Sequence, residues 1–115
     1  MLHVLEAVAA CLTHLLKSGI FMNDNDFEWD DRKAAQNYAK HRVPFELACE
    51  VFDDPFRIEE LDDRDDYGED RFNVLGAICG RVFVVTCTIR GIRIRLISAR
   101  RAEPHERKRY HEEKR

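Results

Sequence analysis

The chain has 115 residues, of which 44% are hydrophobic and 36% are charged. These values predict one domain with a modest core, and they exclude a disordered acidic chain, a collagen-like repeat and a multidomain enzyme. The net charge of -3 conceals an asymmetry: residues 23–75 hold 7 basic and 17 acidic side chains, whereas residues 76–115 hold 11 and 4. The basic C-terminal part is therefore a candidate surface for an anionic partner, unless the acidic part neutralises it in the fold.

The four cysteines are scattered along the chain and form no disulfide or zinc pattern. They are Cys11, Cys49, Cys79 and Cys87. None belongs to a CxxC motif, and no paired histidines complete a zinc site. We expect reduced thiols, no cofactor and a cytoplasmic protein.

Residues 1–21 form an N-terminal extension with leucines at helical spacing. Charged and polar residues interrupt this stretch, which is too short for a membrane span, and no basic region precedes it as in a signal peptide. Two interpretations stay open. The extension is an amphipathic helix that packs on the domain or on a partner, or translation starts at Met22 and the domain comprises residues 22–115.

The first elements of the domain are a short strand and a helix. Residues 27–29 alternate apolar and polar side chains, which indicates an edge strand. Asp30 follows as a helix N-cap. One side of the helix is expected to face the core and carries Ala34, Ala35 and Tyr38. Another side forms a polar stripe of Lys33, Asn37 and His41, with Lys40 beside it.

A second helix is predicted after Val43-Pro44, because proline excludes the preceding residue from the helical region and itself suits a first turn. Its apolar positions are Phe45, Ala48, Cys49 and Phe52. The helix ends at residues 53–55, and a strand at residues 56–61 and a charged loop at residues 62–70 follow.

The pattern then changes to period two. Residues 71–75, 81–89 and 92–98 predict three strands joined by glycine-containing connections at Gly76 and Gly91, as in an antiparallel meander. Residues 82–85 are apolar on both faces, which suits a central strand. In the last strand isoleucine and leucine alternate with Arg93 and Arg95, so one face enters the core and the other presents guanidinium groups.

The charged tail predicts a terminal helix beginning near Pro104, with Tyr110 as its anchor. The order is therefore strand, two helices, a β-meander and a helix. This is an α+β fold, with a small twisted antiparallel sheet on which N-terminal helices and a C-terminal helix pack.

Familiar enzyme signatures are missing: the sequence contains no P-loop, GxGxxG, HExxH or GxSxG motif. The acidic run at residues 62–66 does not have the spacing of a calcium loop, so no metal site is expected. The suggestive set is instead cationic. It comprises Lys33, Lys40, His41, Arg71, Arg81, Arg93, Arg95, Arg100 and Arg101.

Cations with a histidine suit RNA cleavage by the RNA's own 2′-hydroxyl. That reaction needs a base for the 2′ proton, an acid for the 5′ leaving oxygen, and cations for the crowded phosphorane-like charge. The arginine fork binds two phosphate oxygens. Each candidate also has a structural explanation: His41 can bind the last carbonyls of its helix, and Arg93 and Arg95 can contact the acidic part of the chain.

A set of short motifs makes the chain similar to the BrnT family of toxins from type II toxin–antitoxin modules. The motifs run in order from about Asp26 to Tyr110: Phe27-Glu28-Trp29-Asp30, Lys33, Asn37, Lys40-His41, Phe45, Ala48, Val51-Phe52-Asp53-Asp54-Pro55, Gly68-Glu69, Arg71, Leu75-Gly76, Gly80-Arg81, Thr88, Arg90-Gly91, Arg93-Ile94-Arg95-Leu96-Ile97-Ser98-Ala99-Arg100-Arg101-Ala102, Glu106-Arg107 and Tyr110. Two departures are Arg42, where glycine is usual, and Cys87, where an aromatic is common; the first could displace His41.

The resemblance implies a RelE-like fold and a ribonuclease that arrests translation and growth. It also implies a BrnA-like antitoxin partner with a ribbon-helix-helix domain, and promoter binding only through the antitoxin in a hetero-oligomeric complex. Residues 1–21 lie outside the pattern, which favours the start at Met22.

From the resemblance and the chemistry together, we expect Lys40, His41, Arg81 and Arg100 to be catalytic and to meet near the sheet, with His41 as the base. Lys33, Arg71, Arg93 and Arg95 are expected to bind phosphate.

Two other functions remain as alternatives. The chain could be a degenerate toxin that binds an antitoxin and tunes repression through the same basic face. A general RNA-binding domain would need aromatic stacking platforms, and Phe72 and Phe83 lie in core-like patterns instead.

Overall fold

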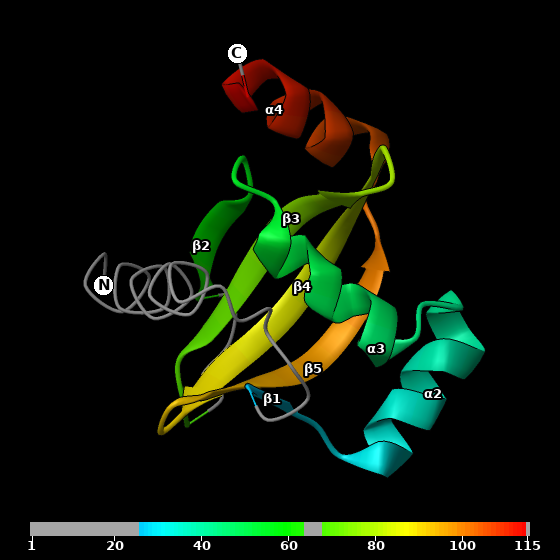
Figure 1. Cartoon of the computed structure of the whole chain (residues 1–115), viewed down its shortest axis with the longest axis vertical. Coiled ribbons are helices and arrows are strands. Elements are labelled where there is room, and N and C mark those ends of the chain that lie inside the picture. Colours follow the sequence, from blue (N-terminus) through cyan, green and yellow to red (C-terminus); the bar gives the residue numbers. More distant parts are fainter. Residues whose placement is uncertain (1–25, 64–67, 115) are drawn as a thin grey trace.

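The computed structural model describes residues 26–63 and 68–114 of the 115-residue chain (Figure 1). The elements in chain order are β1 (Phe27–Glu28), α2 (Asp31–His41), α3 (Phe45–Ala48), the 3₁₀ helix η1 (Cys49–Asp53), β2 (Ile58–Asp62), β3 (Arg71–Ile78), β4 (Arg81–Arg90), β5 (Arg93–Arg101) and α4 (Pro104–Lys114). The expected N-terminal helix and the start at Met22 lie outside the described residues. Within those residues, no helix is long and apolar enough to cross a membrane.

The five strands form one sheet in the order β1-β5-β4-β3-β2. The α+β class and the meander of β3, β4 and β5 are confirmed, and β4 is the central strand, as its apolar run predicts. The sheet is mixed rather than purely antiparallel, because β1 pairs in parallel with β5. A β-bulge interrupts the pairing of β4 with β5: Thr86 pairs with Ser98 and Cys87 pairs with Leu96, which leaves Ile97 as the extra residue.

Helix α2 begins where predicted, since the Asp30 carboxylate accepts hydrogen bonds from the N–H groups of Arg32 and Lys33. These bonds lower the pKa of Asp30. The predicted core-facing side is confirmed for Ala34, which packs against the core, but Ala35 is exposed and the Tyr38 side chain is 45% exposed. Beside Ala34, the inward side carries Asn37 and His41 of the polar stripe, whose Lys33 is exposed.

The centre of that stripe is Asn37, which is only 7% exposed. Its amide nitrogen donates to the carbonyl oxygens of Val43 (3.2 Å) and Ala99 (2.9 Å), and its amide oxygen accepts from the N–H of Ala99 (3.0 Å). Asn37 therefore binds both backbone groups of one residue of β5, and it ties the helix to the sheet by hydrogen bonds where the hydrophobic pattern predicted apolar contact.

The second helix divides into α3 and η1, which cross one face of the sheet (Figure 1). Phe45, Ala48 and Phe52 are buried as predicted. Gly76 was expected to connect two strands, but it lies inside β3. A Cβ atom at this position would come within 2.8 Å of the Val51 Cβ atom of η1. Glycine is therefore needed here because η1 approaches the backbone of the strand closely, and it does not end the strand, which continues to Ile78.

The C-terminal helix α4 lies at one end of the sheet (Figure 1) and is anchored by Tyr110, which is 1% exposed. The Tyr110 hydroxyl donates to the Asp54 carboxylate, which also accepts from the N–H groups of Phe56 (2.9 Å) and Ala77 (2.8 Å). Burial alone would raise the pKa of Asp54, but these hydrogen bonds hold it below its ordinary value. Burial and the same contact raise the pKa of Tyr110 to about 12. One carboxylate thus joins the end of η1, β3 and α4.

Removing the Tyr110 hydroxyl tests this anchor. Tyr110→Phe should lower the free energy of unfolding by about 1–3 kcal/mol, because a buried carboxylate loses a hydrogen bond. Tyr38→Phe makes the same chemical change at a half-exposed ring and should alter it by less than about 0.5 kcal/mol. Urea unfolding of both variants measures the difference, and equal effects would show that the Tyr110–Asp54 contact contributes nothing specific.

Changing the Asn37 amide to a carboxylate tests the tie between α2 and β5. Asn37→Asp replaces two N–H donors by an anion facing two carbonyl oxygens, so it should lower the free energy of unfolding by at least about 3 kcal/mol. Gln36→Glu places the same change at an exposed position of the same helix and should have little effect. Thermal and urea unfolding compare the two, and an Asn37→Asp variant as stable as the control would contradict the role given to the amide.

Candidate functional site

Strand alternation gives the sheet two different faces. One carries the main core cluster, which includes Phe72, Phe83, Val85 and Leu96, under α2, α3 and η1. On the other face the end next to α4 is apolar, with Leu75, Val82, Val84 and Ala102 packed around Tyr110. Away from α4 that second face becomes polar, and this part is the candidate site.

The centre of the polar part is a row of uncharged side chains. The strand registers align Asn73 with Thr86 and Thr86 with Ser98, and the charged Glu60 of β2 lies beside Asn73 at the end of this row. The Thr86 hydroxyl donates to the Asn73 amide oxygen at 2.7 Å, and the Thr88 hydroxyl donates to the Asp70 carbonyl oxygen at 2.6 Å. These contacts hold the middle of the face in a fixed hydrogen-bonded arrangement.

Arginines surround this row, and we call them the arginine face. By strand alternation they are Arg71, Arg90, Arg93, Arg95 and Arg100. The prediction that Arg93 and Arg95 share the face opposite the core is confirmed, because their neighbours Ile94 and Leu96 are buried. Arg100 joins them because the bulge at Ile97 changes the alternation by one residue.

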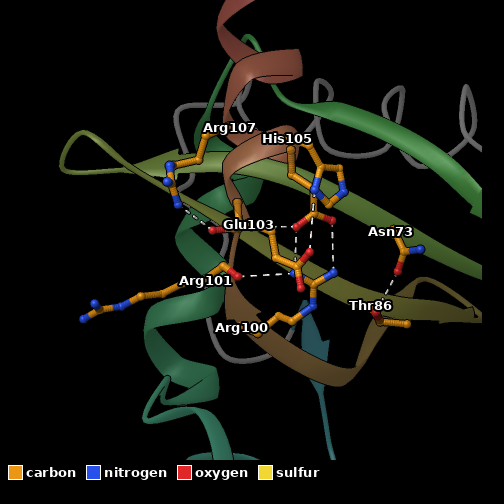
Figure 2. A network of polar contacts seen from close by, with 9 residues as sticks. Asn73, Thr86, Arg100, Arg101, Glu103, His105 and Arg107 are labelled. Atoms are coloured by element: carbon orange, nitrogen blue, oxygen red, sulfur yellow. Dashed lines mark hydrogen bonds and ion pairs between the residues drawn. The ribbon is translucent and has the colours of Figure 1, made fainter.

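Acidic neighbours contact three of these arginines. Arg95 lies 3.7 Å from Glu28 and Arg71 lies 3.7 Å from Glu69. The closest contact is that of Arg100, whose two terminal nitrogens donate to the two carboxylate oxygens of Glu106 at 2.8 and 3.0 Å (Figure 2). This bidentate pair fixes the plane of the guanidinium group. The hydrogen bonds from Arg100 are the main cause that lowers the pKa of Glu106, so the carboxylate stays ionised.

Helix α2 runs along the edge of β5, to which Asn37 ties it, and it carries basic residues near both of its ends. Near its start, the charges of Arg95 and Lys33 both lower the pKa of Asp30, after the backbone hydrogen bonds. At its end, burial lowers the pKa of His41, and the charges of Lys40 and Arg100 add to this effect. The charge of Arg100 therefore acts on His41 at the end of the helix, and the charge of Arg95 acts on Asp30 at its start.

The usual glycine after His41 is replaced by Arg42, and the helix nevertheless ends in the expected way. Arg42 adopts the left-handed conformation with φ of 60°, and its N–H donates to the Tyr38 carbonyl oxygen at 2.8 Å. This is the common helix C-cap geometry in which glycine is favoured. Arg42 therefore leaves His41 on the last turn of α2.

Arg81 is not brought together with the other predicted catalytic residues. It pairs with Ile78 at the start of β4, beside the turn at Cys79 and Gly80. Arg81 is two positions from Phe83 and therefore shares its face of the sheet, whereas Arg100 pairs with Val84 on the other face. Arg101, on that same face, is exposed and points away from the polar network (Figure 2).

Four residues of the site were absent from the sequence prediction: Arg90 of the arginine face, and the polar residues Asn73, Thr86 and Glu106. Asn73 and Thr86 form the centre of the face, and Glu106 orients Arg100. The alternation of polar and apolar residues around Asn73 and Thr86 carries a signal for these two. No local pattern pairs Glu106 with Arg100, because their contact depends on how α4 turns back over the sheet.

One group in the described residues has the composition of a metal site. Glu103, His105 and Glu106 offer ligand atoms within 4.8 Å of one another in the first turn of α4. Two of these residues are exposed, and Glu106 already binds Arg100 and the N–H of Glu103 (2.8 Å). The arrangement is therefore that of a helix cap with an ion pair.

The family comparison can be set beside this geometry. The family described as "Ribonuclease toxin, BrnT, of type II toxin-antitoxin system" matches residues 29–106, more than half of the chain. The chain belongs to the BrnT family. The matched range contains the whole arginine face, the basic residues of α2 and Glu106. A comparison with curated proteins found no match.

The lowered pKa of His41 predicts how the stability of this BrnT protein depends on pH. Because the folded state binds the His41 proton less tightly than the unfolded state, the free energy of unfolding should fall as the pH drops below about 6.5. His41→Gln should remove this part of the pH dependence, whereas His105→Gln, at an exposed histidine, should keep it. Urea unfolding between pH 5 and 8 compares the three proteins; identical pH profiles for wild type and His41→Gln would contradict the prediction.

Proposed function

We propose that the protein is a metal-independent endoribonuclease that cleaves RNA by attack of the 2′-hydroxyl on the adjacent phosphate. The observation that carries this proposal is the arginine face, five guanidinium groups on one side of a sheet with Lys40 and His41 at its border. Cleavage by this route needs a base for the 2′ proton, concentrated positive charge, and an acid for the 5′ oxygen, which leaves as the bond from the 2′ oxygen to phosphorus forms. His41, the arginines and the Lys40 ammonium group are proposed for these three roles.

His41 is proposed as the base. Its lowered pKa keeps the imidazole neutral near pH 7, so that a ring nitrogen can accept the 2′ proton. Arg100 then stabilises the charge that develops on the phosphate. The bidentate contact with Glu106 orients the guanidinium group before the RNA binds, which makes its stabilisation of the transition state more effective. Lys40 adds positive charge beside them.

The remaining cations are proposed to bind the RNA backbone. Arg71, Arg93 and Arg95 lie on the arginine face, and Lys33 lies in the first turn of α2. Arg81 was expected to be catalytic, but it lies on the opposite face of the sheet, so its contribution to cleavage has to be measured by mutagenesis.

The biological role proposed here extends that of the family. The protein would act in the cytoplasm on RNA that translation requires, so that cleavage inhibits translation and arrests growth. A BrnA-like antitoxin with a ribbon-helix-helix domain would neutralise the toxin in a hetero-oligomer and would carry the complex to its promoter DNA. The α+β order, with a C-terminal helix packed on the sheet, supports a RelE-like fold.

A second candidate function is a degenerate toxin that binds the antitoxin without cutting RNA. The ion pairs of Arg95 with Glu28 and of Arg100 with Glu106 favour it, because both occupy guanidinium groups that a nuclease would use. The two functions differ in whether the purified protein cleaves RNA.

Neighbouring arginines on opposite faces provide the test. Arg100→Ala should reduce the rate of RNA cleavage by at least about a hundredfold, since one charge-stabilising donor typically contributes this much. Arg101→Ala removes the same group from the opposite face and should leave the rate within about threefold. Arg81→Ala, measured in parallel, decides whether the catalytic centre extends around the end of the sheet.

The products and the cellular effect complete this test. Cleavage should persist in EDTA and leave 2′,3′-cyclic phosphate and 5′-hydroxyl ends. Induction of the wild-type chain in a bacterium should arrest growth together with RNA degradation, and Arg100→Ala should not. Folded wild-type protein that neither cleaves RNA nor arrests growth would support the degenerate toxin, and equal loss in the Arg100 and Arg101 variants would contradict the assignment of the face.

A further inference from the structure

The uncharged row of Asn73, Thr86 and Ser98 lies between two groups of arginines on the arginine face. On β4, Thr86 is two residues from the partner of Arg100 in one direction and two residues from the partner of Arg95 in the other. Two residues of a strand span about 6.6 Å. An RNA strand whose phosphates bind arginines on both sides would therefore pass over this row. The inference drawn from this arrangement rests on the proposed function, in which the arginine face binds RNA.

The row contains a fixed hydrogen-bond donor that no protein group uses. The Thr86 hydroxyl, on a side chain that is only 9% exposed, donates to Oδ1 of Asn73 at 2.7 Å (Figure 2). This bond determines which end of the Asn73 amide is the donor. Within the described residues, Nδ2 of Asn73 makes no hydrogen bond, although it carries two N–H groups. Asn73 also lines the same hollow as Arg100, next to the proposed catalytic centre.

The groups around this donor are acceptors. Oδ1 of Asn73 keeps a second lone pair beside the one that Thr86 uses. Glu60, which pairs with Asn73 across β2 and β3, adds a carboxylate that Arg109 holds at 2.8 Å. A group that binds here must therefore bring an acceptor for Nδ2 and, next to it, a donor for these oxygen atoms.

We propose that Asn73 determines the base preference of the ribonuclease and selects adenine or cytosine beside the cleaved phosphate. Both bases place an amino group next to a ring nitrogen that accepts hydrogen bonds, whereas guanine and uracil carry a carbonyl oxygen in place of that amino group. The ring nitrogen would accept from Nδ2 of Asn73, and the amino group would donate to Oδ1 or to Glu60. Single-stranded RNA presents these base edges to a protein.

The charges around the row separate the base from the backbone. Asp62, Asp63 and Glu106 also line the hollow beside Asn73, and they repel a phosphate more strongly than an uncharged base. The arginines on either side attract phosphates instead. The backbone would therefore stay on the arginines while the base turns toward Asn73, and a carbonyl oxygen on that base would face other acceptors.

Cleavage of a random-sequence RNA pool tests this selection. The purified full chain digests the pool, and sequencing of the product ends gives the base frequencies on both sides of the cleaved bond. At one flanking position of the wild-type products, adenine and cytosine together should exceed guanine and uracil by at least about fivefold, as expected for one good pair of base contacts. Asn73→Ala should reduce this excess to about twofold or less, because it removes the donor.

Two changes at Thr86 separate the orientation of the amide from its presence. Thr86→Val keeps Asn73 and the volume of the threonine side chain but lets the amide rotate, so the base preference should fall. Thr86→Ser keeps the hydroxyl and should retain the preference. Gln36→Ala removes an exposed amide from α2 and should alter neither the preference nor the rate. Because Thr86→Val preserves the packing, the test stays decisive where Asn73→Ala fails to fold.

Several results would overturn the inference and leave the proposed nuclease intact. These are equal use of the four bases by the wild type, a preference for guanine or uracil, and an unchanged preference in both Asn73→Ala and Thr86→Val. Folded Asn73→Ala protein that loses cleavage at all sequences alike would also overturn it, because Asn73 would then not act on the base. Wild-type protein that cleaves no RNA would overturn the proposed function, and the inference with it.

Discussion

The arrangement of the site depends on one side-chain amide. Strand β1 pairs with only two residues of β5, Ile94 and Arg95, so β1 leaves the later backbone groups along this edge of the sheet without a partner strand. Asn37 binds the N–H and the carbonyl of Ala99 on that edge, much as a neighbouring strand would. The contact fixes the direction of α2 along β5. The start of α2 therefore lies within reach of the charge of Arg95, which acts on Asp30, and its end within reach of the charge of Arg100, which acts on His41.

The acidic and basic parts of the sequence meet in the fold at the arginine face. Acidic side chains from the N-terminal part reach the border of the arginine face, where Glu28 and Glu69 contact arginines at 3.7 Å. The shortest of these contacts comes from the basic part itself, through Glu106. These acidic residues thus hold individual guanidinium groups of the arginine face in place.

Much of the fold follows from the sequence, and the failures have physical causes. Strand alternation and capping residues are local, so the meander, the Asp30 cap and the Tyr110 anchor could be predicted. The inward side of α2 could not be predicted in full, because hydrophobic patterns assign asparagine to the exposed side. Asn37 is buried because its amide binds the backbone of Ala99, on a strand distant in the sequence. The candidate cations could be named from the sequence, but the arrangement of these residues in the fold could not. Which arginines share a face depends on register, and a bulge in β5 cannot be read from alternation alone.

That bulge makes the length of β5 part of the site. Arg95 and Arg100 are five positions apart, an odd spacing that places two residues of a regular strand on opposite faces. The extra residue at Ile97 restores them to one face and leaves Arg101 on the other. Deleting Ile97 would exchange the faces on which Arg100 and Arg101 lie, without removing any charged residue from the strand. A gap in an alignment of this segment is therefore informative, because a relative with one residue fewer between Arg95 and Arg100 would place different arginines on this face, even with every charged residue retained.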